Sequence, residues 1–147
     1  MEKIRDSKEY IGAEGFMRAI RTKEIYIKSK RMELEALTYR AGGVTGIDYS
    51  KDKIQTSPTN FFEMTMADIH DIEMELKKEI EKLEQMKGKA YSFIRQLDSS
   101  EQRALLEWYY INGLNMMESG DKMHISERKA YYIRDDALYN IGKLMNF

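Results

Sequence analysis

A heptad repeat of apolar residues between residues 61 and 97 is the feature that most restricts the fold of this chain. Seven residues make two turns of helix, so apolar side chains at this spacing line one helical face. At about 1.5 Å per residue the predicted helix is roughly 55 Å long, too long for a small domain to bury it. We therefore expect a coiled-coil arm. The repeat consists of Ile69, Leu76, Leu83, Ala90 and Leu97, with Met66, Ile80 and Ile94 at companion positions.

A second helix with the same spacing is predicted over residues 16–41. Glycine readily adopts the left-handed conformation that ends a helix, so Gly42 and Gly43 are expected to end this one. The simplest arrangement is a helical hairpin over residues 1–97, with residues 42–58 as its loop and the first twelve residues frayed. The heptad positions of the second helix are Ile20, Ile27, Leu34 and Ala41.

The basic residues of this second helix permit two interpretations. Residues 18–31 carry six Lys or Arg against one Glu. Such a stripe can track the phosphates of a nucleic acid. It can also be the flank of a coiled coil that pairs with acidic residues on the neighbouring helix. In an antiparallel hairpin it lies opposite residues 70–83, which are rich in Asp and Glu, so the second interpretation is favoured.

Residues 98–147 are predicted to form a compact helix-turn-helix domain. Asn115 and Glu118 match a capping box that begins a short helix, and Ser126 matches the cap of a longer helix after a three-residue turn. The apolar segment 102–111 is a natural packing partner. In a helix-turn-helix domain the second helix enters the major groove of DNA. The apolar stripe of that helix is Ala130, Ile133, Ala137, Ile141 and Leu144.

The opposite face of the longer helix supplies the candidate DNA-binding residues. Arg and Lys can contact guanine acceptors or phosphates, Tyr can contact a thymine methyl or a phosphate, and a capped helix N-terminus favours a phosphate. Asp135 and Tyr139 are expected to point outward, with Asp135 and Asp136 beyond the groove. The structural alternative is a three-helix core with a merely polar outer face. The candidates are Ser126, Glu127, Arg128, Lys129, Tyr131 and Tyr132.

Composition argues against several functional classes. The chain has no cysteine, no apolar run of about 18 residues and no apolar stretch at its start, so we expect a cytoplasmic protein without a membrane partner. His70 and His124 stand alone, and no phosphate loop, nucleophile motif or catalytic carboxylate pair occurs. Neither an enzyme nor a metal or other cofactor is expected. Residues 112–147 hold five basic and five acidic residues, which predicts weak or assisted DNA binding.

The residues around the predicted turn resemble the promoter-reading C-terminal domain of bacterial sigma factors. Asn115 to Gly120 and Met123 to Ser126 match that family's first helix and turn. Ser119 and Glu127 depart from it, since the family has an aliphatic and a basic residue there. The inward positions of the family's recognition helix correspond to Ala130, Ile133, Ala137 and Leu138. The resemblance implies DNA contacts by Glu127, Arg128, Lys129, Tyr131 and Tyr132.

Over residues 16–145 the chain also resembles the small phage late-gene transcription regulators of the ArpU/RinA type. These share the long helical region, the Ile54 to Ser57 segment and the sigma-like C-terminus in this order. The resemblance implies a phage- or prophage-encoded regulator that activates late genes at a promoter. We expect double-stranded DNA and host RNA polymerase as partners, and a homodimer or higher oligomer. Two alternatives stay open: a DNA-packaging recognition subunit of the small-terminase kind, and a protein-interaction module that binds polymerase without reading DNA.

Overall fold

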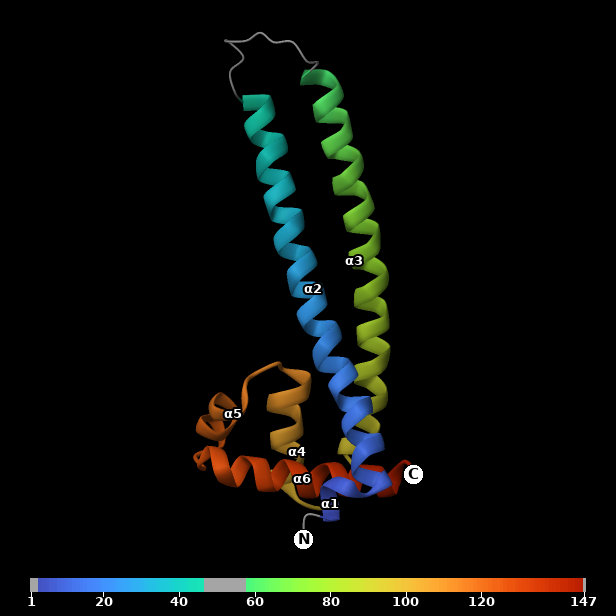
Figure 1. Cartoon of the computed structure of the whole chain (residues 1–147), viewed down its shortest axis with the longest axis vertical. Helices are drawn as coiled ribbons and strands as arrows, with labels where there is room; N and C mark the ends of the chain where they lie inside the picture. The colour runs from blue at the N-terminus through green and yellow to red at the C-terminus, as the bar shows by residue number, and fades with distance from the viewer. Residues whose placement is uncertain (1–2, 47–57, 147) are drawn as a thin grey trace. The chain divides into compact units, whose positions relative to one another are not determined.

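The computed structural model describes residues 3–46 and 58–146, and every regular element in these ranges is helical (Figure 1). The expected all-α fold is thereby confirmed. The elements are α1 (Lys3–Asp6), α2 (Lys8–Gly46), α3 (Pro58–Ile94), α4 (Ser100–Leu106), the π-helical segment η1 (Glu107–Ile111), α5 (Met116–Met123) and α6 (Glu127–Leu144).

The chain divides into two compact units, which we call the head (residues 1–25 and 83–147) and the arm (residues 26–82). The long helices α2 and α3 contribute to both. This division differs from the boundary expected at residue 97, because the first turns of α2 and the last turns of α3 belong to the core of the head. Met17 and Ile94, for example, are fully buried there.

Within the arm, α2 and α3 run antiparallel and side by side (Figure 1). The Tyr26 hydroxyl donates a hydrogen bond to the Glu75 carboxylate, and the Lys30 Nζ lies 3.8 Å from Glu75 Oε1. These contacts join the two helices of the arm as an antiparallel hairpin. They also favour the coiled-coil flank over the phosphate stripe for the part of the basic segment that lies in the arm. The buried heptad and neighbouring residues of the arm are Ile27, Ala41, Ile69, Ile72 and Leu76.

Both long helices depart from their predicted ends. Helix α2 continues through Gly42 and Gly43 to Gly46, so the prediction that the two glycines end it is wrong. Glycine permits the left-handed conformation without imposing it, and a helix passes through glycine at a cost of about 1 kcal/mol. Helix α3 begins at Pro58. The amide at the first position of a helix makes no intrahelical hydrogen bond, so proline, which lacks this hydrogen, is tolerated there. The segment 54–57, which the family resemblance singled out, lies outside the described residues.

Helix begins at Lys3 and, after a bend at Ser7, resumes at Lys8, so the expectation of a frayed start is wrong for residues 3–12. Ser7 fixes the bend between α1 and α2: its Oγ accepts from the Tyr10 amide at 3.1 Å and donates to the Ile4 carbonyl at 2.7 Å. The apolar stripe of α2 extends back through Tyr10, Ala13 and Met17, all buried. The burial of this stripe supplies the stabilisation that the isolated sequence lacks.

Helices α2 and α6 cross with their backbones in contact. A Cβ added to Gly142 of α6 would lie 2.1 Å from the carbonyl oxygen of Glu9. No side chain fits into that distance, so glycine is what permits this crossing. Further along α2, Arg21 donates to the carbonyls of Tyr109 and Leu114 at 2.7 and 2.9 Å. Helix α2 is thus joined both to α6 and to the segment that leads into α5.

Candidate nucleic-acid interface

Helix α5 begins with the capping box that the sequence predicts. The Glu118 amide donates to Asn115 Oδ1 at 2.8 Å, and the Asn115 amide donates to Glu118 Oε1 at 3.0 Å. Two amides at the start of α5 are therefore satisfied by side chains, which stabilises a helix of only eight residues. The start of α5 is determined by its own sequence.

A tight turn connects α5 to α6. His124 ends α5 in the left-handed conformation with φ 60°, and the Ile125 amide donates to the Gly120 carbonyl at 2.9 Å. A Cβ on Gly120 would lie 3.0 Å from the Ile125 carbonyl oxygen, so a larger residue would crowd the turn. Ser126 then caps α6 by accepting from the Lys129 amide at 3.1 Å. The predicted order of short helix, turn and longer helix is confirmed.

The inner face of α6 packs on α4 and α5. The expected stripe is buried at Ala130, Ile133, Ala137 and Ile141, while Leu144 is half-buried. Around its first turns a compact cluster joins Ala130 and Ile133 to Leu105 of α4 and Met116 of α5. This packing holds the first turns of α6 in place and leaves their other face to solvent.

That outer face brings the predicted site residues together over the first two turns of α6. All six candidates, Ser126, Glu127, Arg128, Lys129, Tyr131 and Tyr132, are exposed. Arg128 Nε donates to the Tyr132 hydroxyl at 3.2 Å, and this bond raises the pKa of the Arg128 guanidinium. Lys129 Nζ lies 3.8 Å from a Glu101 carboxylate oxygen in a solvent-exposed pair. Such a pair contributes little, so Lys129 is free to exchange it for another anion.

Asp135 is not the outward-pointing residue that the sequence led us to expect. Its side chain is 13% exposed, and three groups contact it: Arg5 Nε at 2.8 Å, an Arg134 nitrogen at 3.3 Å and the Tyr10 hydroxyl at 3.4 Å. Burial raises the pKa of Tyr10, an effect that Arg134 opposes and Asp135 reinforces, so the phenol stays neutral and can donate. Two of the three contacts come from the first ten residues, which cover this part of α6.

Tyr139 also departs from expectation, since it is half-buried. The ammonium of Lys143 lies 5.0 Å from the centre of its ring, within reach of a cation–π contact. Asp136, by contrast, is exposed as predicted. After the second turn of α6, therefore, fewer of the side chains on its outward face are exposed to solvent.

Arg5 is a residue of this surface that the sequence analysis missed. It lines an open groove of about 490 Å³ together with Glu127, Arg128, Tyr131 and Tyr132. Arg5 and α6 are more than 120 residues apart in the sequence, so no local pattern places them together. The signal available in the sequence was the helical spacing of the apolar residues Tyr10, Ala13 and Met17, which indicates that the start of the chain packs against another element.

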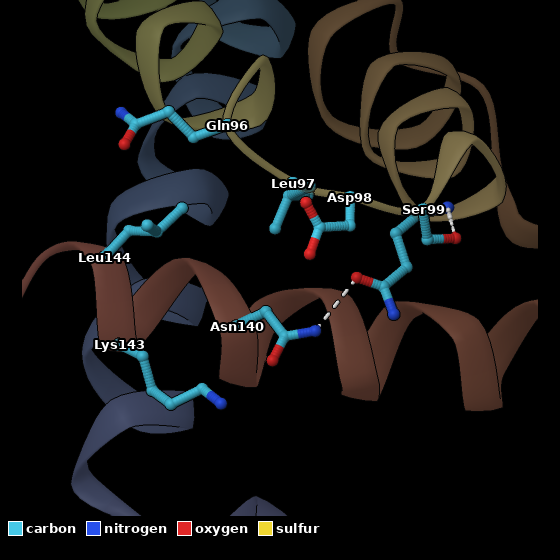
Figure 2. A pocket seen from close by; sticks show the side chains of 8 residues that line it. Gln96, Leu97, Asp98, Ser99, Asn140, Lys143 and Leu144 are labelled. Atoms are coloured by element: carbon cyan, nitrogen blue, oxygen red, sulfur yellow. Dashed lines mark hydrogen bonds between the residues drawn. The ribbon is translucent and has the colours of Figure 1, made fainter.

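A second hollow of about 360 Å³ lies where the α3–α4 connection passes α6 (Figure 2). The Asn140 side-chain amide donates to Gln102 Oε1 at 3.1 Å across it, joining α6 to α4. The charged residues that line this hollow are Asp98 and Lys143, which do not form a nucleophile–base pair. The lining residues are Gln96, Leu97, Asp98, Ser99, Gln102, Asn140, Lys143 and Leu144.

Neither a metal site nor a membrane span is present in residues 3–46 and 58–146. No group of three His, Cys, Asp or Glu side chains in these ranges is placed to hold a metal ion. No helix there has the length and apolar character that crossing a bilayer requires. Compared with protein-family models, curated proteins and solved structures, the chain gives no match.

Proposed function

We propose that this chain is a phage- or prophage-encoded transcription regulator that binds double-stranded DNA through the first turns of α6 and activates late genes together with host RNA polymerase. One observation carries the proposal. A capped short helix and a tight turn present a second, well-packed helix whose outer face offers Arg128, Lys129, Tyr131 and Tyr132 to solvent. This is the geometry with which helix-turn-helix domains read the major groove.

The chemistry of the outer face suits a groove lined by base edges and phosphates. Arg128 and Lys129 lie on the first turn, where recognition helices make base contacts, and both can bind guanine acceptors or phosphates. The phenols of Tyr131 and Tyr132 can pack on a thymine methyl or donate to a phosphate. Ser126 satisfies one of the first amides of α6, and the positive end of the helix dipole still favours a nearby phosphate.

The proposal is tested by measuring how the DNA affinity of the wild type and of two double variants depends on salt concentration. Fragments of the genome that encodes the chain are titrated with protein at low and moderate salt. The Arg128→Ala/Lys129→Ala variant is expected to bind at least about tenfold more weakly, with a smaller dependence on salt concentration. The matched control is Lys77→Ala/Lys78→Ala, which removes the same charge from exposed positions of the arm. Equal binding by the two double variants would contradict the proposal.

The balanced charge of residues 112–147 favours a second candidate, a module that contacts polymerase without reading DNA. This candidate predicts a folded protein that binds no DNA fragment at any salt concentration but is captured by purified RNA polymerase. Arg128→Ala would then weaken capture by RNA polymerase, and neither the variant nor the wild type would bind DNA. The same pair of assays thus separates the two functions.

Self-association through the arm is the other part of the proposal. Met32 and Tyr39 of α2 lie seven residues apart and are 69% and 76% exposed, a second apolar stripe beside the buried one. If they are core positions of a parallel pair with a second copy, Lys28 faces Glu33 and Glu35 faces Arg40 across the contact. Both pairs are oppositely charged, as flanking positions of matched coiled coils are. A second copy of the chain is therefore the occupant that this surface fits.

Sedimentation of two matched double variants tests the contact. Met32→Glu/Tyr39→Glu is expected to convert a dimer into a monomer, because it places repelling carboxylates along the stripe. Met64→Glu/Met74→Glu adds the same two negative charges at exposed apolar positions of α3 and should leave the dimer intact. A wild-type monomer would contradict the contact, and a ring of many copies would favour the DNA-packaging alternative.

A further inference from the structure

The groove on the outer face of α6 is closed on one side by the start of the chain. Arg5 of α1 lines it beside Arg128, although the two residues are far apart in sequence. Its place is fixed in two ways: Ser7 fixes the bend into α2, and α2 contacts the backbone of α6 at Gly142. Arg5 therefore extends over the outer face from a docked helix.

The charge balance of this surface depends on Arg5. Asp135 and Asp136 are the acidic residues of α6 beyond its first two turns, and Asp135 is the one that Arg5 contacts. Asp135 is held between Arg5 Nε at 2.8 Å and Arg134 at 3.3 Å. Two guanidinium groups around one carboxylate leave a net positive charge. Arg5 thus adds a positive charge beside Arg128 in a groove whose one acidic lining residue is Glu127.

The guanidinium of Arg5 has donors left for a ligand. Its side chain is 56% exposed, and within the described residues its Nε–H is the donor that makes a hydrogen bond. An arginine carries five N–H donors in a planar fork, so its two terminal amino groups remain to bind an anion. A phosphodiester is an oxygen-rich anion that suits such a fork.

We propose that Arg5 binds a phosphate of the DNA backbone while Arg128 and its neighbours enter the adjacent groove. This inference rests on the proposed function and deepens it, because it makes the start of the chain part of the DNA-binding site. In this role Arg5 fixes the position of α6 on the duplex and carries no sequence information itself.

A cycle of four proteins separates a direct phosphate contact from simple neutralisation of Asp135. Wild type, Arg5→Ala, Asp135→Asn and the double variant are titrated with the same DNA fragment at several salt concentrations. Loss of one phosphate contact reduces the slope of log affinity against log salt by about 0.9. We expect this reduction, and a loss of affinity of about three- to tenfold, both in the wild-type background and in Asp135→Asn.

If Arg5 only neutralises Asp135, replacing it has no effect once Asp135 is an uncharged asparagine. If Arg5→Ala lowers the DNA affinity equally in the wild type and in Asp135→Asn, the phosphate contact is supported. If Arg5→Ala lowers the affinity only in the protein that retains Asp135, the phosphate contact is overturned. Arg18→Ala is the matched control, since Arg18 is an exposed arginine of the head that pairs with Glu14 at 3.4 Å. It removes the same charge and should leave the slope unchanged.

Two further readouts make the result decisive. Thermal unfolding checks that Arg5→Ala keeps the head folded, and Arg5→Lys preserves the charge and should retain the wild-type salt slope with weaker binding. Wild-type protein that binds no DNA contradicts the proposed function itself. Wild-type binding that depends on Arg128 and Lys129, with an unchanged slope in Arg5→Ala, contradicts only the role of Arg5.

Discussion

The two halves of α6 have similar side chains and opposite environments. The outer half (residues 127–132) and the covered half (residues 133–144) each contain an arginine within 6 Å of a tyrosine ring: Arg128 lies 5.8 Å from the centre of Tyr132, and Arg134 lies 5.1 Å from that of Tyr131. Arg128 is exposed, whereas the Arg134 side chain is 14% exposed and pairs with Asp135 and Tyr10. The docked start of the chain makes this difference.

One helix can therefore carry two separate functions. The covered half joins α1 and α2 to the rest of the head, and the outer half is left to a ligand. Substitutions in the covered half should change the free energy of unfolding, and substitutions in the outer half should change binding. Each of the following predictions tests that separation, beginning with the largest effect.

Gly142→Ala should be the most destabilising change in the covered half. Its Cβ would lie 2.1 Å from the Glu9 carbonyl oxygen, and a backbone atom cannot move aside as a side-chain tip can. Overpacking of this kind typically costs about 1–3 kcal/mol, and we expect a net loss near the middle of that range after the gain in helix propensity. Urea unfolding followed by circular dichroism measures it.

Gly88→Ala provides the control for helix propensity. Gly88 lies in α3, and a Cβ added there would have no neighbouring atom within 4 Å, so the substitution introduces a methyl group without a clash. It should stabilise the protein by up to about 1 kcal/mol. If both alanine variants were stabilised alike, the close crossing of α2 and α6 would not exist in solution.

Replacing the two arginines of α6 in turn tests the comparison directly. Arg134→Ala removes hydrogen bonds to Asp135 and Tyr10 from a largely buried site and should cost about 1–2 kcal/mol of unfolding free energy. Arg128→Ala removes an exposed group and should change stability by less than about 0.5 kcal/mol. The order of effects is expected to reverse in DNA binding, where Arg128→Ala is the more harmful. Equal effects in either assay would remove the distinction between the two halves.

The features that sequence predicted well are determined by neighbours in the chain. The capping box at Asn115 and Glu118 and the cap at Ser126 depend on residues a few positions apart, and both are present. The heptad stripe is buried at its predicted positions except Leu34, which is half-buried, whereas the companion residue Met66 is 43% exposed. The inner stripe of α6 follows from helical periodicity alone. Its outer face was predictable in the same way over the first two turns, since exposed positions follow once the buried ones are known.

The features that sequence missed depend on contacts between distant segments. Asp135 was expected to face solvent because nothing near it in the sequence indicates that Arg5 and Tyr10 cover it. Gly142 is likewise the crossing point of two helices, a role that helical periodicity does not reveal. Gly42 and Gly43 show the converse error, because the pair predicts a helix end and instead lies within α2. A glycine has a predictable role only when its tertiary neighbours are known.

Ser119→Ala should give a small effect and, like Gly88→Ala, a stabilising one. Ser119 lies in α5, is fully buried, and its hydroxyl has no hydrogen-bond partner within the described part of the chain. A buried hydroxyl without a partner is destabilising, so Ser119→Ala should raise the free energy of unfolding by about 0.5–1 kcal/mol. Ser92→Ala is the control, since Ser92 is exposed on α3 and donates to the Lys89 carbonyl at 2.6 Å. A gain at Ser119 that exceeds the one at Ser92, with unchanged DNA affinity, would show that α5 supports the outer half without belonging to the binding surface. A loss of stability in Ser119→Ala would instead mean that the hydroxyl has a partner in solution.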